Sequence, residues 1–287
     1  MPERMRKLLV YLSFVRVSHS VFALPFALTG ALLAWRTEPF SWWQVWWILV
    51  CMVAARSAAM GFNRLVDARF DALNPRTAMR ELPRGALSAR EAALFVVASS
   101  IVFVWAAGRL SALCLALSPV ALAIVFWYSL AKRYTTYTQL FLGLAMAVAP
   151  VGGWIAAGGR AGAEPWLLGL AIGLWVGGFD ILYACQDVAF DRAHGLRSIP
   201  ARYGVGAAIR LSRLMHVATI VAMTALWRAA ALPSLYLAGV IVVAVLLAYE
   251  QSLVSEHDLS LVRKAFDLNG YVGIIYFAAT AVSLVLG

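Results

Sequence analysis

Long apolar runs separated by short polar segments dominate the chain. A helix needs about 20 residues to cross the hydrocarbon core of a membrane, and a spanning segment must satisfy its own backbone hydrogen bonds. Each long run is therefore expected to be a transmembrane α-helix. Such runs occupy residues 17–36, 42–62, 90–109, 111–131, 136–158, 164–186, 207–228, 230–250 and 269–287. The pattern predicts an all-α polytopic membrane protein of about nine spans, with residues 1–287 forming a single transmembrane domain.

The composition agrees with lipid as the surrounding solvent. Of the 287 residues, 63% are hydrophobic and 13% charged, against about 45–50% and about 25% in soluble domains. A net charge of +10 alone would fit a nucleic-acid-binding protein, but the basic residues lie in short loops between the apolar runs. We therefore expect membrane lipid, and no nucleic acid, as a partner. No cleavage signal follows the first basic residues, so the first apolar run is expected to be a retained helix.

The distribution of charge along the loops predicts an orientation. Most of the 24 lysines and arginines lie in the N-terminal tail and the even-numbered loops. The positive-inside rule places these segments, and the N-terminus, on the cytoplasmic side of the cell's inner membrane. The eleven tryptophans mostly mark the membrane interfaces, as the cluster at residues 42–47 illustrates. The odd-numbered loops hold only Arg36, Arg109, Arg160 and Arg228.

Acidic residues at the ends of two predicted spans carry the candidate chemistry. The second span ends in Asn63, Asp67 and Asp71, and the sixth ends in Asp187 and Asp191. Residues four apart share one face of a helix. Both clusters close even-numbered spans, so we expect them on the same cytoplasmic face, where they can meet across one cavity.

The residue types in the two clusters fit the binding of Mg²⁺. Carboxylate and amide oxygens are hard ligands, and Mg²⁺ commonly binds through one or two carboxylates together with substrate phosphates. A simpler interpretation is that these acids are solvated helix ends paired with neighbouring arginines. The chain has only 14 acidic residues, and acids at membrane depth are usually functional, which favours a metal site. The predicted ligands are Asn63, Asp67, Asp71, Asp187 and Asp191.

Two charged residues are predicted to lie at membrane depth near these clusters. Arg56 precedes Asn63 by two helical turns, so it either pairs with Asp180 or receives an acidic group of a substrate. Asp180 lies one to two turns deeper than Asp187, and a supporting role is favoured over direct catalysis.

Further candidates for substrate contacts come from loops and helix ends. Tyr128, Lys132 and Arg133 close the fourth span, and the two cations either satisfy the positive-inside rule or bind diphosphate oxygens. Arg76 belongs to a loop that could cover the site, and it would share a face with Arg80 if that loop were helical after Pro75.

These motifs together resemble the UbiA superfamily of intramembrane prenyltransferases. Its signatures are an N-D-x-x-D-x-x-x-D run after the second helix and a D-x-x-x-D run after the sixth, found here at residues 63–71 and 187–191. Arg64 replaces the usual second-position aspartate, while Tyr128 and Lys132 match a Y-x-x-x-K element. The resemblance covers the whole chain. Segments 63–83 and 179–200 look most like the 4-hydroxybenzoate polyprenyltransferase-like branch, which includes enzymes of the futalosine route to menaquinone.

The resemblance implies a UbiA-type bundle around a lipid-accessible cavity and a Mg²⁺-dependent reaction. A polyprenyl group would pass from polyprenyl diphosphate to a small aromatic acceptor of the 4-hydroxybenzoate or 1,4-dihydroxy-6-naphthoate type, in ubiquinone or menaquinone biosynthesis. The aspartates of both motifs would act through the metal, and Lys132 would neutralise charge as the allylic C–O bond breaks. Arg56 or Arg16 would bind the acceptor's carboxylate.

Two alternatives remain open from the sequence. Other UbiA-type enzymes prenylate haem, chlorophyllide or lipid ethers, and they differ from one another in the acceptor pocket rather than in the diphosphate machinery. A secondary transporter also uses charges inside the membrane, but its ion sites lie near the midplane, whereas the acids of this chain gather at one face.

Overall fold

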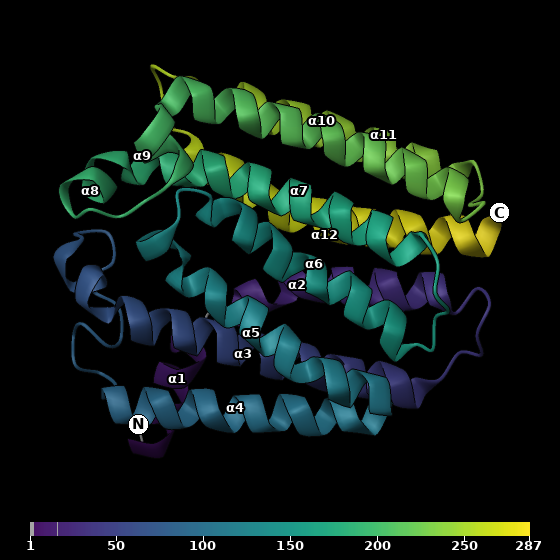
Figure 1. Ribbon diagram of the computed structural model, residues 1–287, viewed down its shortest axis with the longest axis horizontal. Helices are drawn as coiled ribbons and strands as arrows, with labels where there is room; N and C mark the ends of the chain where they lie inside the picture. The colour runs from purple at the N-terminus through teal and green to yellow at the C-terminus, as the bar shows by residue number, and fades with distance from the viewer. Residues whose placement is uncertain (1–2, 16) are drawn as a thin grey trace. The chain divides into compact units, whose positions relative to one another are not determined.

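Helices account for every regular element in the part of the chain that the computed structural model describes, residues 3–15 and 17–287 (Figure 1). Among these residues, α2 (Val17–Ala34) takes the place of the first predicted span and contains a shorter apolar stretch, Leu24–Ala34. The expected all-α architecture of about nine spans is confirmed. Eight described helices are long and apolar enough to cross a membrane: α3 (Trp42–Leu73), α4 (Ala89–Leu110), α5 (Ala112–Tyr134), α6 (Thr138–Ala156), α7 (Glu164–Ala184, continued by shorter helices), α10 (Val205–Ala229), α11 (Leu235–Ser252) and α12 (Val262–Leu286).

Four short helices supplement the spans. The span pattern did not predict α1 (Glu3–Phe14), because its residues mix apolar and basic side chains. The helix α7 is followed directly by a 3₁₀ turn, η1 (Cys185–Asp187), and by α8 (Val188–Ala193). A further short helix, α9 (Ile199–Tyr203), precedes α10.

The chain divides into two compact units. The first comprises Met1–Val21 and Trp42–Leu130, and the second comprises Phe22–Ser41 and Ala131–Gly287. Each unit is discontinuous in sequence, because α2 contributes most of its length to the unit that is otherwise C-terminal.

In the first unit α3 and α4 pack side by side (Figure 1). A capping box begins α4: the Ser88 hydroxyl accepts a hydrogen bond from the Glu91 N–H, and the Glu91 carboxylate accepts one from the Ser88 N–H. The Phe14 ring of α1 is completely buried and meets Phe95 of α4 edge to face, with ring centroids 6.0 Å apart. These contacts fix α1 against the start of α4.

The second unit is held together by close helix packing and buried hydrogen bonds. The helix α7 packs against both α6 and α10, and α11 packs against α12 (Figure 1). The Ser212 hydroxyl of α10 donates to the Gly178 carbonyl of α7 at 2.7 Å and accepts from the Gln251 amide of α11 at 2.7 Å. The Trp175 indole of α7 donates to Asn269 of α12 at 2.6 Å. All of these groups are buried, so the hydrogen bonds link four helices without help from water.

Glycines bring α6 and α7 into direct backbone contact. A Cβ atom added to Gly143 of α6 would lie 2.3 Å from the Gly173 carbonyl oxygen of α7, which is too close for the two backbones to keep their positions. Small residues at such crossings allow helices to approach closely in membranes, where van der Waals packing drives association. Gly152, on the same helix, is exposed, and its added Cβ would meet nothing within 4 Å.

We expect Gly143→Ala to lower the thermal stability of the detergent-solubilised protein, by about 1–3 kcal/mol, because the added methyl group forces α6 and α7 apart. Gly152→Ala is the matched control on the same helix, and it should be neutral or stabilising by up to about 1 kcal/mol, since alanine is the better helix former. Thermal unfolding followed by size-exclusion chromatography measures both. Equal shifts in the two variants would show that the crossing does not constrain the fold.

Candidate active site

The first acidic cluster occupies the last turns of α3. This helix has 32 residues and is therefore about 48 Å long, well beyond the roughly 30 Å of a hydrocarbon core. Its C-terminal turns can therefore carry polar groups outside the apolar layer. Asn63, Asp67 and Asp71 lie there at the predicted four-residue intervals, and the Asn63 amide donates a hydrogen bond to Asp67 Oδ2 at 3.2 Å.

Asp71 forms a close ion pair with an arginine of the following loop. Arg80 Nη1 lies 2.7 Å from Asp71 Oδ1 and 2.8 Å from Oδ2. The Asp71 side chain is only 9% exposed, so the pair is well shielded from solvent. The Thr77 hydroxyl also donates to the Asp71 backbone carbonyl at 3.0 Å. The loop is thus fixed to the end of α3 through both the side chain and the backbone of one residue.

The loop itself consists of consecutive turns rather than the helix considered from the sequence. The Arg76 N–H donates to the Asn74 side chain at 3.0 Å, and Gly85 has a φ of +72° that a helix would not allow. As a result the two arginines do not share a face: Arg76 is exposed, whereas Arg80 is half-buried against Asp71. Ser13 of α1 holds the loop from the other side by donating to Glu81 Oε1 at 2.6 Å.

Arg56 lies deeper along α3, two turns before Asn63. Its Nε atom is buried and has no hydrogen-bond acceptor in the described part of the chain. Tyr128 of α5, in the same unit, lies within electrostatic range of the guanidinium. A buried N–H donor of a cation without an acceptor is costly, and an acidic ligand would remove that cost. Arg16, the other predicted partner of the acceptor, lies outside the described residues.

The second acidic cluster begins where α7 ends. The helix does not continue through the motif: Asp187 lies on the 3₁₀ turn η1, and Asp191 lies in α8. Asp180, within α7, is in electrostatic range of Asp187, Asp191 and Lys132. These four residues therefore lie near one another within the second unit.

Asp191 is completely buried, and each of its carboxylate oxygens has a partner. Lys132 Nζ lies 3.3 Å from Oδ1, and the Ser198 hydroxyl donates to Oδ2 at 2.9 Å. The Arg197 N–H donates to the Lys132 carbonyl at 2.8 Å, which ties the loop before α9 to the end of α5. Arg133, the neighbour of Lys132, is half-buried.

The donor atoms of both clusters suit a hard divalent cation. The first cluster supplies the carboxylate of Asp67, whose Oδ2 accepts a hydrogen bond from the Asn63 amide. The second supplies Asp187 and Asp191. Among residues 3–15 and 17–287, no three histidine, cysteine or acidic side chains come together as a complete metal site. Carboxylate oxygens are nevertheless hard ligands of the kind that divalent cations prefer.

Comparison with known proteins identifies the family. Residues 23–278 match the model of the UbiA prenyltransferase family. The chain belongs to this family. The 4-hydroxybenzoate octaprenyltransferase of Citrobacter koseri is 30% identical over 293 residues, which cover 97% of each chain. The protein is accordingly a prenyltransferase, embedded in a membrane by its apolar helices.

Solved UbiA structures share the fold. The apo structure of a UbiA homologue from Aeropyrum pernix K1 superposes with a TM-score of 0.85 at 36% identity, over 93% of this chain and 98% of that one. A UbiA homologue from Archaeoglobus fulgidus, solved with GPP and Mg²⁺ bound, gives a TM-score of 0.70 at 20% identity, over 95% of this chain and 99% of that one.

Two partners of the motif aspartates were missed by sequence reasoning about this prenyltransferase. The pairing of motif acids with neighbouring arginines is the simpler interpretation of the sequence, but nothing in the spacing of Arg80 from Asp71 marks this arginine as the partner. Ser198 precedes a proline-containing turn and caps α9 by accepting from the Ala201 N–H at 3.3 Å. A serine before such a turn signals a helix N-cap, but no pattern shows that its hydroxyl also reaches Asp191.

We expect Lys132→Met to destabilise the protein, because it leaves the buried Asp191 carboxylate without its counter-charge. The loss should be at most about 3 kcal/mol, since Lys132 is 35% exposed and part of the pair's field is screened by solvent. The double variant Lys132→Met with Asp191→Asn should regain most of the thermal stability, because no charge remains buried. If the double variant is no more stable than the single one, the ion pair is not what stabilises this part of the fold.

Proposed function

We propose that this prenyltransferase transfers a polyprenyl group from a Mg²⁺-bound polyprenyl diphosphate to a hydroxylated aromatic acid. The observation that carries the proposal is the presence of two clusters in which carboxylates of the family motifs lie beside cations, Asp71 with Arg80 and Asp191 with Lys132. The relative from Citrobacter koseri is named a 4-hydroxybenzoate octaprenyltransferase, which supports a hydroxybenzoate acceptor. With that acceptor, the proposed reaction would belong to ubiquinone biosynthesis. A dihydroxynaphthoate acceptor, and with it menaquinone biosynthesis, is the alternative that the assay below separates.

Asn63, Asp67, Asp71, Asp187 and Asp191 would hold the metal. When bound, Mg²⁺ would neutralise the diphosphate and stabilise the charge that develops on it as the allylic C–O bond breaks. Lys132 adds a cation whose position is fixed before the substrate arrives, so little reorganisation is needed during the reaction. Arg133 and Arg76 are proposed to contact phosphate oxygens, and Asp180 to support the second cluster through its field.

The acceptor is proposed to bind through its carboxylate. Arg56 has a buried donor without an acceptor, which an aromatic carboxylate would satisfy. Tyr128 lies close enough to influence that guanidinium and is proposed to contact the aromatic substrate. Arg16 is retained as a second candidate for this role. The ring carbon of the acceptor forms the new bond to the allylic carbon, the diphosphate leaves with the C–O electron pair, and the ring then loses a proton.

The apolar helices provide the medium that the reaction requires. An allylic cation is captured by water unless water is excluded, and a polyprenyl tail needs an apolar region that opens to lipid. The basic residues of the even-numbered loops support an inner-membrane location with both clusters on the cytoplasmic side.

The metal assignment predicts that Asp67→Ala and Asp187→Ala each reduce turnover about 100-fold or more, because each removes a ligand that positions charge against the leaving group. The measurement is transfer of radiolabelled polyprenyl diphosphate by the purified enzyme in detergent, with and without Mg²⁺. 4-Hydroxybenzoate and 1,4-dihydroxy-6-naphthoate are offered separately, so the product also names the acceptor.

Asp258→Asn is the control for that experiment. Asp258 lies in an exposed loop, accepts a hydrogen bond from the Ser260 N–H at 2.9 Å and belongs to neither motif. Its substitution should leave turnover unchanged. Full activity of the Asp67 and Asp187 variants, or activity that is independent of divalent metal, would contradict the metal assignment.

The acceptor assignment predicts that Arg56→Gln raises the KM for the aromatic acid at least about tenfold, which corresponds to the loss of one charge-assisted hydrogen bond. The KM for polyprenyl diphosphate should change little. The methyl ester of the acceptor lacks the negative charge, so the KM for the ester should differ much less between the wild-type enzyme and the Arg56→Gln variant. An equal KM increase for the acid and its ester would show that Arg56 does not bind the carboxylate.

A further inference from the structure

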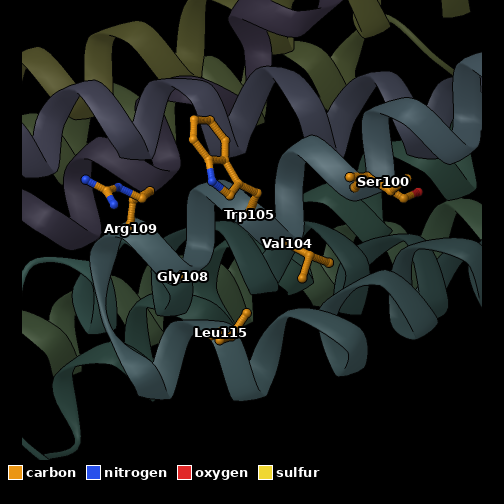
Figure 2. A pocket seen from close by; sticks show the side chains of 7 residues that line it. Ser100, Val104, Trp105, Gly108, Arg109 and Leu115 are labelled. Atoms are coloured by element: carbon orange, nitrogen blue, oxygen red, sulfur yellow. The ribbon is translucent and has the colours of Figure 1, made fainter.

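An open groove lies between α4 and the start of α5, within the first unit, and no residue of the acidic motifs lines it (Figure 2). Its volume is about 610 Å³. Ile101, Val104 and Leu115 provide apolar walls, Gly108 leaves the space between the helices unfilled, and Arg109 lies at one end. We propose that this groove binds one anionic phospholipid, with the phosphate at Arg109 and an acyl chain along the apolar walls.

The shape and lining of the groove suit an acyl chain. Ser100 and Arg109, its furthest residues along α4, are nine positions apart, which is about 13 Å along a helix. The side chains between them are apolar, and Ile101 and Leu115 remain 64% and 44% exposed. A narrow apolar channel of this length accepts part of a lipid tail, because the tail is as apolar as its walls.

The position of Arg109 places its charge at headgroup depth. Its guanidinium lies 5.3 Å from the centroid of the Trp43 ring and 5.9 Å from that of Trp47, and the Trp43 indole donates to the Arg109 carbonyl at 3.3 Å. Trp105, which lines the groove, meets Trp47 edge to face with centroids 4.9 Å apart. Tryptophans gather where headgroups meet the hydrocarbon core. The groove therefore leads from the level of lipid phosphates into the apolar layer.

The charge of Arg109 is available to an anion. Of the arginines in odd-numbered loops, Arg36 donates to the Ala230 carbonyl at 2.5 Å, and Arg160 pairs with Glu38 at 2.9 Å. No carboxylate lies within ion-pair distance of Arg109 in the described part of the chain. A phosphate oxygen would supply the missing negative charge, whereas a neutral polyprenyl chain or an apolar helix would not.

Photo-cross-linking tests the proposal directly. The full-length protein is placed in nanodiscs of phosphatidylcholine that contain a small fraction of phosphatidylglycerol carrying a diazirine in mid-chain. After irradiation, labelled peptides are mapped by mass spectrometry. We expect labelling of residues 100–105 and 112–117, several-fold stronger than with a phosphatidylcholine probe of the same acyl chains. Arg109→Gln should reduce the phosphatidylglycerol labelling about fivefold, the ratio expected for one arginine at the membrane surface.

Two further variants keep the test decisive. Arg228→Gln is the matched control, because Arg228 also lies over a tryptophan, Trp227, at 5.7 Å, and lines no part of this groove. The labelling pattern of this variant should equal that of the wild-type protein. Gly108→Leu should reduce labelling by both probes, since the new side chain fills the groove, and a Cβ at Gly108 meets only Leu115 at an ordinary 3.5 Å.

Three results would overturn the proposal. Equal labelling by the two probes would show that the groove does not select an anion. An equal loss of phosphatidylglycerol labelling in Arg109→Gln and Arg228→Gln would show that the labelling depends on the general surface charge of the protein and not on Arg109. Loss of labelling on addition of polyprenyl diphosphate, or a cross-link to a second copy of the chain, would assign the groove to another occupant.

Discussion

The cost of burying charge in an apolar protein is the constraint on which the rest of the structure depends. A carboxylate that is removed from water without a partner is strongly unfavourable. The completely buried Asp191 is acceptable because Lys132 and Ser198 occupy both of its oxygens. Asp71 likewise has a counter-charge, the guanidinium of Arg80, with which it forms an ion pair. The loops that supply Arg80 and Ser198 are therefore obligatory parts of the fold, and not only connections between spans.

The same pairing explains how a charged site can exist before its substrate binds. A carboxylate and a cation together carry no net charge, so each pair can be buried at less cost than either member alone. Both members nevertheless remain chemically useful. Under the proposed function the carboxylates are metal ligands and Lys132 is a phosphate partner. The carboxylate–cation pairs of the free protein would then be replaced by carboxylate–metal and lysine–phosphate pairs, in which the charges again balance. The field is already oriented when the substrate arrives, which is the condition for electrostatic catalysis.

Features that depend on local periodicity could be predicted from the sequence, and features that depend on loop geometry could not. The spans follow from the length of the apolar runs, and the placement of Asn63, Asp67 and Asp71 on successive turns of α3 follows from a four-residue spacing on a continuous helix. The same spacing does not predict that the α-helix gives way to a 3₁₀ turn at Asp187. The choice of Arg80 rather than Arg76 as the partner of Asp71 depends on turns that no periodic pattern encodes.

Glycine allows close helix contact in one unit and leaves an open groove in the other, and the group that faces the glycine decides which of the two occurs. Gly143 faces the backbone of α7, and because it has no side chain the two helices can approach closely. Gly108 faces only the end of the Leu115 side chain, and the space beside it stays open as part of the groove. In water such an apolar gap would tend to close, because closing it would release water from apolar surface. In a membrane the competing occupant is a lipid chain as apolar as the walls, so there is no such driving force, and the groove can persist as a binding site.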